Sequence, residues 1–292
     1  MNLCNRDTLA ACGSTGLFVL LWSSGAIVSK LGLAHATPFA FLLLRFSVAL
    51  LAFLLLMRLL PLRVPARSGT RLYALATGLV LVGAYQVFYL LALAQQVTPG
   101  VMATLLGVQP ILTAVLLERG LSPARLCGLL LGLLGLVLVV YQGIGLAGLS
   151  WAGMLCGLLA LASITAGTIM QKGIRDNPLG SLPIQYLAGL LLCVAVVPFQ
   201  PFELERVAGF WLSLLWMALV ISVAATLLLY RLIARGNLVN VTSLFYLVPA
   251  VTAWLDYLVF GNRLASLSLL GMALIVLGLL LVFRQAPRGV RG

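Results

Sequence analysis

Long apolar runs separated by short polar segments fill the chain. Each run has about 20 residues, the length that an α-helix needs to cross the hydrocarbon core of a bilayer. Membrane β-strands would instead give alternating segments of about 10 residues. The pattern predicts ten spans, at Ala11–Leu31, Pro38–Leu60, Leu72–Ala94, Pro99–Leu117, Pro123–Tyr141, Trp151–Gln171, Leu179–Phe199, Phe210–Leu232, Val239–Phe260 and Ala265–Phe283.

Basic residues cluster on one side of these spans. With the N-terminus in the cytoplasm, most of the 18 Lys and Arg residues fall in inner loops or at inner helix ends. Cytoplasmic loops carry such an excess of Lys and Arg. Both termini are therefore expected on the cytoplasmic side of a multi-pass membrane protein.

The segment Thr98–Glu118 recurs in altered form as Asn237–Gly261. Each copy is an apolar run with hydroxyl residues in its first half and a proline near its middle, Pro110 in one copy and Pro249 in the other. A mid-span proline removes a helical hydrogen bond, and the freed carbonyl needs a partner inside the protein. Paired interruptions of this kind in two halves of a chain indicate a transporter binding site.

The recurrence extends to the whole chain. Gly25 and Lys30 align with Gly167 and Lys172, and glycines in the fifth predicted span align with glycines in the tenth. Five spans are an odd number, so the second copy enters the membrane from the opposite face. We therefore expect an all-α integral membrane protein of ten helices in an inverted 5+5 repeat, with domains at 1–145 and 146–292.

Composition excludes several classes of protein. The chain is 63% hydrophobic and only 8% charged, far from the composition of soluble domains. The net charge of +12 comes from residues at the ends of spans, so it indicates topology and no nucleic-acid partner. The five cysteines are scattered without CxxC spacing, which gives no indication of a metal site or a disulfide framework. The first apolar run resembles a signal peptide, but Trp22-Ser23-Ser24 interrupts it, so we expect a retained span.

Several short motifs occur in the order typical of one family. They are Trp22-Ser23-Ser24, Leu44-Arg45-Phe46, Leu117-Glu118-Arg119-Gly120-Leu121-Ser122-Pro123, Tyr246-Leu247-Val248-Pro249 and Gly261-Asn262-Arg263-Leu264. With these motifs the chain resembles the ten-helix EamA-type permeases of the drug/metabolite transporter superfamily over nearly its whole length. The resemblance implies an exporter of small metabolites, often amino acids or their derivatives, in a bacterial inner membrane.

Two positions depart from the family pattern. Asn262 stands where the family has a glutamate before the last span. The small four-helix relatives couple protons through a glutamate in their first span, whereas Ala11–Leu31 contains no acidic residue. Their coupling residue cannot be carried over to this chain.

Polar and aromatic side chains inside spans are expected to face the helix bundle, because exposure to lipid is costly. Helix packing or membrane-interface anchoring is the alternative role for each of them. The predicted solute-binding residues are Trp22, Ser23, Tyr85, Gln86, Tyr89, Thr104, Gln109, Thr165, Thr168, Ser243 and Tyr246.

Three ionisable residues fall within or near the ends of spans. Placing a charge at mid-membrane costs about 2.5–3.5 kcal/mol, so such residues indicate function. Lys30, Arg45 and Asp256 all fall in the outer half of the bilayer. We expect Asp256 to pair with Arg45 or Lys30 in a gate or in ion coupling, with snorkelling as the alternative for Lys30. Glu118 is expected to be solvated at the inner boundary.

These patterns favour a secondary transporter that works by alternating access. The resemblance to the EamA-type permeases implies that it exports its substrate and that a proton gradient drives it. A passive channel, a membrane scaffold and a membrane-embedded enzyme are the alternatives. The only histidine, His35, falls in an outer loop, so no Ser/His or metal-ligand arrangement reaches membrane depth. No P-loop is present, and neither a cofactor nor a catalytic or metal-binding residue is expected. The expected partners are the lipid bilayer and a small-molecule substrate. Amino-acid-derived metallophores are one class of substrate that would suit the predicted binding residues. The chain is expected as a monomer or a homodimer.

Overall fold

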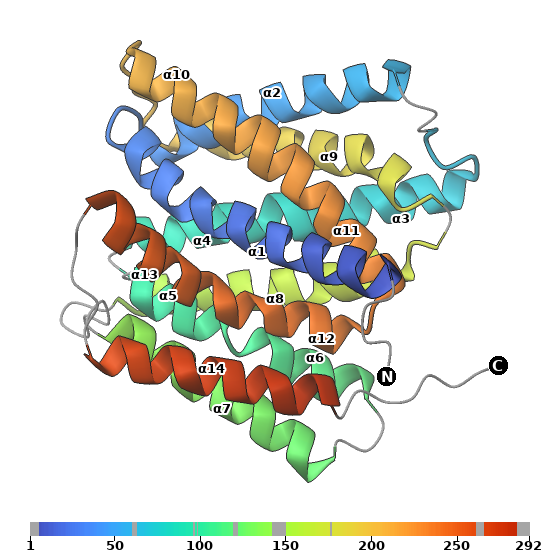
Figure 1. Ribbon diagram of the computed structural model, residues 1–292. Coiled ribbons are helices and arrows are strands. Elements are labelled where there is room, and N and C mark those ends of the chain that lie inside the picture. Colours follow the sequence, from blue (N-terminus) through green and yellow to red (C-terminus); the bar gives the residue numbers. More distant parts are fainter. Residues whose placement is uncertain are drawn as a thin grey trace. The chain divides into compact units, whose positions relative to one another are not determined.

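The computed structural model describes residues 6–59, 63–95, 97, 99–118, 122–141, 150–175, 177–260 and 266–284. Throughout this part of the chain the regular secondary structure is helical (Figure 1). The α-helices are α1 (Arg6–Leu33), α2 (Pro38–Leu59), α3 (Ser68–Gly78), α4 (Tyr85–Ala94), α5 (Pro99–Leu106), α6 (Gln109–Leu117), α7 (Pro123–Val140), α8 (Trp151–Gly173), α9 (Leu182–Val196), α10 (Ala208–Leu215), α11 (Thr226–Arg235), α12 (Leu238–Ser243), α13 (Leu247–Phe260) and α14 (Ser266–Arg284). The π-helices are η1 (Leu79–Ala84) and η5 (Trp216–Ala225), and the 3-10 helices are η3 (Leu179–Ser181), η4 (Val197–Phe199) and η6 (Leu244–Tyr246).

Seven helical runs in the described part are long and apolar enough to cross a membrane. They are Gly13–Leu33, Pro38–Leu59, Ser68–Ala94, Trp151–Gly173, Leu179–Phe199, Ala208–Ala234 and Ser266–Arg284. Two shorter apolar runs, Pro123–Val139 and Leu238–Thr252, accompany them. The prediction of an all-helical, multi-pass membrane protein is confirmed. The total of ten spans and the orientation of the termini stay predictions.

The chain divides into two compact units that alternate along the sequence. Unit 1 comprises Met1–Ala84 and Met170–Arg235, and unit 2 comprises Tyr85–Ile169 and Gly236–Gly292. Each unit therefore contains segments of both predicted repeats. The repeat boundaries at 1–145 and 146–292 are not set by these contacts and stay a prediction.

A seam of glycines joins α7 to α14 inside unit 2. A Cβ atom built on Gly135 would lie 2.5 Å from the carbonyl oxygen of Gly271, and one built on Gly271 would lie 2.5 Å from that of Gly135. Gly128 and Gly278 form a second pair of the same kind, at 2.7 and 2.5 Å. Such small residues let helix backbones approach closely in a membrane. These glycines therefore allow the close packing of α7 against α14.

The order of the glycine pairs gives the direction of the two helices. Gly128 lies opposite Gly278 and Gly135 lies opposite Gly271, so α7 and α14 run antiparallel. In the sequence alignment of the repeats, however, Gly128 corresponds to Gly271 and Gly135 to Gly278. Exchanging the repeats thus maps each glycine contact onto the other, which is the relation that an inverted repeat requires.

Two π-helices interrupt spans that correspond in the two repeats. In unit 1, η1 follows α3 and η5 follows α10. A π-helix is rare and often marks a functional position, because its wider turns leave backbone groups to be satisfied by neighbours. The close approach of η1 to α9 depends on glycine, since a Cβ on Gly189 would lie 2.7 Å from Val82.

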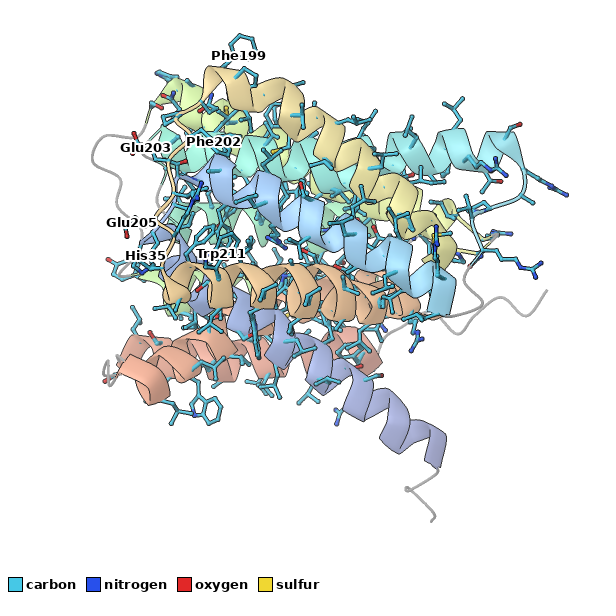
Figure 2. The ribbon with its side chains drawn as sticks, turned by 90° about the horizontal axis from the view of Figure 1, so that it is seen from above. His35, Phe199, Phe202, Glu203, Glu205 and Trp211 are labelled. Atoms are coloured by element: carbon cyan, nitrogen blue, oxygen red, sulfur yellow. The ribbon has the colours of Figure 1, made fainter. Side chains whose placement is uncertain are left out.

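The loop between α1 and α2 pairs with the loop that follows η4 at one end of unit 1 (Figure 2). Ala36 and Leu204 form an isolated antiparallel bridge, and the amide of Glu205 donates to the carbonyl of His35 at 2.7 Å. The His35 ring also lies 2.8 Å from a Glu205 carboxylate oxygen, but both side chains are substantially exposed. An exposed pair of this kind contributes little stability.

Candidate functional site

The span that contains Pro110 is broken into α5 and α6. Gly107 and Val108 form a turn between these helices, with Gly107 donating to the carbonyl of Ala103 and Val108 to that of Leu105. Pro110 lies in the first turn of α6 and is buried. Because proline has no N–H, it is tolerated at the start of a helix, where that donor would have no helical partner.

The span that contains Pro249 is broken at the corresponding place. There the 3-10 segment η6 separates α12 from α13. Tyr246, its last residue, lies three positions before Pro249, as Gly107 lies three positions before Pro110. Pro249 is partly buried. Both predicted helix-break residues therefore lie beside real interruptions, within the same unit.

A cluster of polar side chains lies next to the α5–α6 break. The Gln109 side chain is 2% exposed and its Nε2 donates to Thr168 Oγ1 of α8 at 3.3 Å. Thr113 Oγ1 donates to the backbone carbonyl of Gln109 at 2.8 Å. Thr165, one helical turn before Thr168, is also buried and donates to a carbonyl of its own helix. The structure thus brings together three of the predicted binding residues, Gln109, Thr165 and Thr168.

Aromatic residues of α4 form a second group in unit 2. The rings of Tyr85 and Tyr89 lie 6.1 Å apart, centroid to centroid, and both are half-buried beside a cluster that includes Met102. Gln86 is half-buried on the same helix. The spacing of four residues placed the two tyrosines on one face, as predicted.

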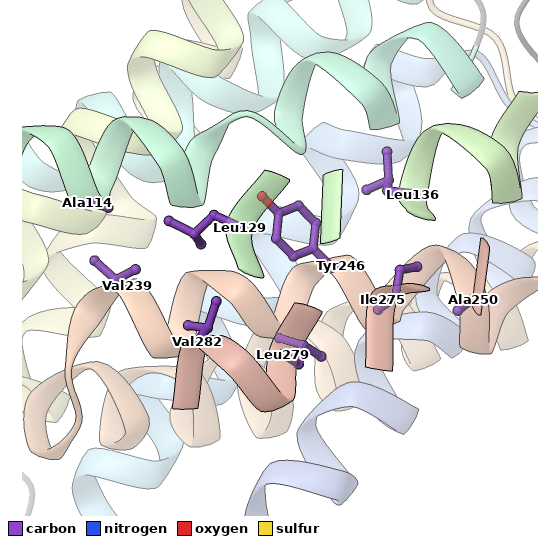
Figure 3. Packing of buried hydrophobic residues seen from close by; sticks show 9 residues of the cluster. All are labelled: Ala114, Leu129, Leu136, Val239, Tyr246, Ala250, Ile275, Leu279 and Val282. Atoms are coloured by element: carbon purple, nitrogen blue, oxygen red, sulfur yellow. The ribbon is translucent and has the colours of Figure 1, made fainter. Parts of the chain in front are cut away.

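Ser243 and Tyr246 lie in the packed interior of unit 2. Ser243 Oγ donates to the carbonyl of Val239 at 2.7 Å. The Tyr246 ring belongs to a cluster with Leu129 and Ile275 (Figure 3), and a Cβ on Gly132 would lie 2.7 Å from it. Among the described atoms the Tyr246 hydroxyl has no hydrogen-bond partner, although it is buried. A buried donor without a partner costs about 1–3 kcal/mol, so this hydroxyl requires an explanation.

Trp22 and Ser23 belong to α1 in unit 1. Ser23 is fully buried, and the Trp22 ring packs at 5.4 Å from that of Phe18. The side chains of Lys30, Thr104 and Asp256 lie outside the described part of the structure. Arg45 is described, and its Nε donates to Ser222 Oγ at 2.8 Å. That all these residues serve one pocket and one gate stays a prediction.

The buried ion pair of Arg125 and Glu118 was not predicted from the sequence. Arg125 is 1% exposed, and its NH2 group donates to a Glu118 carboxylate oxygen at 2.7 Å. The same group reaches the side-chain oxygens of Asn237 and Asn240 at 3.1 and 3.0 Å, and NH1 donates to the carbonyl of Val282 at 2.8 Å. Four separate segments of unit 2 are therefore joined at one guanidinium.

This arrangement corrects the expectation for Glu118. Its side chain is only 9% exposed and neutralises a buried cation, whereas a solvated loop position was expected. A buried charge needs a partner and further hydrogen bonds. The sequence signal that could have found the pair is Arg125 itself, a cation two residues inside an apolar helix after Ser122-Pro123.

The Arg125 contact has a weaker counterpart at the other end of the α7–α14 seam. Ser268 of α14 donates to the carbonyl of Val139 of α7 at 3.4 Å, whereas Arg125 of α7 donates to that of Val282 of α14. These two contacts exchange when the repeats are exchanged. The repeats thus share geometry but differ in charge.

Comparison with known proteins identifies the family. The EamA-like transporter family matches twice, over residues 14–141 and 151–284. The chain belongs to the EamA-like transporter family. It is therefore a multi-pass membrane protein of a family that transports small molecules. The resemblance noted in the sequence is confirmed, and one matched segment lies within each of the two predicted repeats.

Solved structures support the fold of this EamA-like transporter. One crystal structure of a protein aligns over 96% of this chain and 98% of its own, with a TM-score of 0.79 and 22% sequence identity. At that identity the likeness shows the fold alone. A search of curated proteins finds no match.

Proposed function

We propose that this EamA-like protein is a secondary exporter of small metabolites in a bacterial inner membrane, with both termini cytoplasmic. The proposed substrates are amino acids or amino-acid-derived compounds, metallophores among them. Export is proposed to proceed by alternating access of an inverted 5+5 repeat and to be driven by the proton gradient.

The observation that carries this proposal is the pair of helix breaks at corresponding positions of the two repeats. A discontinuous helix leaves backbone N–H and C=O groups free to bind a solute, whereas a continuous helix uses these groups in its own hydrogen bonds. The break beside Pro110 also has a buried amide and a hydroxyl, those of Gln109 and Thr168, at hydrogen-bonding distance. Neutral groups of this kind suit a polar solute that must be released again.

The antiparallel seam of α7 and α14 supports alternating access. Two repeats whose contacts exchange with one another can adopt each other's conformation, which opens the protein first to one side and then to the other. Lys30, Arg45 and Asp256 are proposed as the gate or coupling residues, since ionisable groups within spans are costly without function.

The first experiment compares metabolites inside and outside cells with and without the protein. We expect one or a few amino-acid-like compounds to accumulate outside only when it is present. Purified protein in liposomes is then preloaded with each unlabelled compound and supplied with a trace of labelled compound. A carrier gives saturable counterflow, and a protonophore abolishes accumulation against a gradient.

Three results would contradict the proposal. Unsaturable flux would favour a channel. Absence of flux for every compound that accumulates outside cells would favour a scaffold. A chemically altered compound inside the liposomes would favour an enzyme.

A further inference from the structure

Ser222 lies in the middle of the π-helix η5 and accepts hydrogen bonds from two neighbouring helices. It is fully buried. Its hydroxyl oxygen accepts from Arg45 Nε of α2, and its backbone carbonyl accepts from the Tyr186 hydroxyl of α9, both at 2.8 Å. Nothing in the sequence around Ser222 distinguishes it from other serines in apolar spans.

The hydrogen bond between Arg45 and Ser222 involves a permanent positive charge, the Arg45 guanidinium. The guanidinium lies within an apolar helix, in the eighth position of α2, and is partly buried. Hydrogen bonds that involve a charged group are shorter and stronger than neutral ones. The Ser222 hydroxyl therefore contributes to fixing where along the span the Arg45 guanidinium lies.

The Tyr186 hydroxyl satisfies a carbonyl of the π-helix. Its ring is fixed by Phe46 and Phe53 of α2, at centroid distances of 5.8 and 4.9 Å, so the helix that carries Arg45 also orients Tyr186. Thr226 lies 3.4 Å from the same hydroxyl and donates to the carbonyl of Ile221, five residues earlier. These contacts favour the wide π-turn over an α-turn.

The π-turn and the position of Arg45 depend on each other. A π-helix accommodates an extra residue, and its conversion to an α-helix would rotate one side of the span by about 100° relative to the other. Ser222 could not then face α2 with its hydroxyl and α9 with its carbonyl. The π-helix of the first repeat, η1, is packed differently, since a Cβ on Gly83 would meet Leu192 and Gly189.

We propose that Ser222 and Tyr186 are positioning residues, which hold η5 in its π form and thereby place the Arg45 charge for transport. This assignment deepens the proposed function and rests on it where transport is concerned. Arg45 is the residue that acts in gating or coupling, and Ser222 acts through it.

The first test needs no substrate. Hydrogen exchange of peptides that cover 216–226 is measured in detergent for wild type and for Ser222→Ala, Ser222→Thr and Tyr186→Phe. Exchange in Ser222→Ala and Tyr186→Phe should be about 3- to 20-fold faster, the range that corresponds to measured side-chain hydrogen bonds in membrane proteins. Ser222→Thr keeps the hydroxyl and should restore protection. Ser213→Ala is the matched control, because Ser213 is a buried serine of α10 next to Gly32.

Coupling to Arg45 is tested by combining variants. If Ser222 acts through Arg45, adding Ser222→Ala to Arg45→Met, whose side chain has no donor, should produce no further increase in exchange. Additive increases would overturn the positioning role, as would wild-type exchange in both Ser222→Ala and Tyr186→Phe. If Ser222→Ala is not monodisperse, Ser222→Cys takes its place, because cysteine is close to serine in size and accepts a weaker hydrogen bond from Arg45.

A second test uses counterflow of radiolabelled amino acids. Ser222→Ala should reproduce the change in KM, maximal rate and pH profile caused by Arg45→Gln. Ser222→Thr keeps the hydroxyl and should have wild-type kinetics. Wild-type kinetics in Ser222→Ala would overturn the assignment. If wild-type protein transports nothing, the proposed function fails, and the exchange measurements alone decide whether Ser222 positions Arg45.

Discussion

The glycine seam between α7 and α14 gives a sharp prediction for stability. In Gly135→Ala the new Cβ would lie 2.5 Å from the carbonyl oxygen of Gly271 and 2.8 Å from the amide nitrogen of Ile275. Both atoms belong to the backbone of α14 and cannot turn aside as a flexible side chain would. Since ordinary carbon–oxygen contacts begin about 1 Å further out, the two helices must separate by a similar distance.

The expected cost follows from this separation. Forcing one extra methyl group into a well-packed core destabilises a protein by about 1–3 kcal/mol. That corresponds to a roughly 5- to 150-fold change in the unfolding equilibrium. Gly271→Ala should cost a similar amount, because its Cβ meets Gly135 in the same way. The double variant should cost less than the sum, since the first methyl group has already separated the helices.

Unfolding of the purified protein by dodecyl sulfate in mixed micelles measures these differences. Gly16→Ala is the control, because Gly16 lies in α1 with no atom within 4 Å of its built Cβ. Alanine is the better helix former, so this control should be neutral or stabilising. Wild-type stability in both Gly135→Ala and Gly271→Ala would refute the close contact of α7 and α14.

Three further predictions concern buried or exposed polar groups. Glu118→Ala should destabilise by about 3–5 kcal/mol, because it leaves the Arg125 charge buried without its counterion; Glu118→Gln should cost less in the same unfolding assay, and equal costs would exclude a dominant charge effect. Tyr246→Phe removes a hydroxyl without a described partner, so the midpoint temperature of thermal unfolding should not fall. The rate of counterflow should fall if the hydroxyl binds solute. A lower unfolding midpoint would instead reveal a structural partner. His35→Ala breaks an exposed pair with Glu205 and should change stability by less than about 0.5 kcal/mol, and a larger loss in thermal unfolding would show that the pair holds the loops together.

Periodic and local features of the chain were readable from the sequence. Apolar runs of spanning length indicated a multi-pass helical protein, and the prolines at 110 and 249 indicated two helix breaks. Both inferences depend on properties of a single segment, its length in a bilayer or its missing N–H.

Contacts between distant segments were not readable in this way. Glu118 reads as an ordinary loop carboxylate until folding brings it, α12 and α14 around Arg125 of α7. Ser222 reads as one hydroxyl among many until a π-turn directs it toward Arg45.

The sequence by itself determined the class of protein, the repeat and the positions of the two proline breaks. Only the tertiary structure decided which polar groups are buried together, which side chains of α2 and α9 hydrogen-bond to η5, and how α7 meets α14. The physical reason is that hydrophobic length and backbone chemistry act within one helix. The energy of a buried charge or hydroxyl, by contrast, depends on partners that folding brings from elsewhere in the chain.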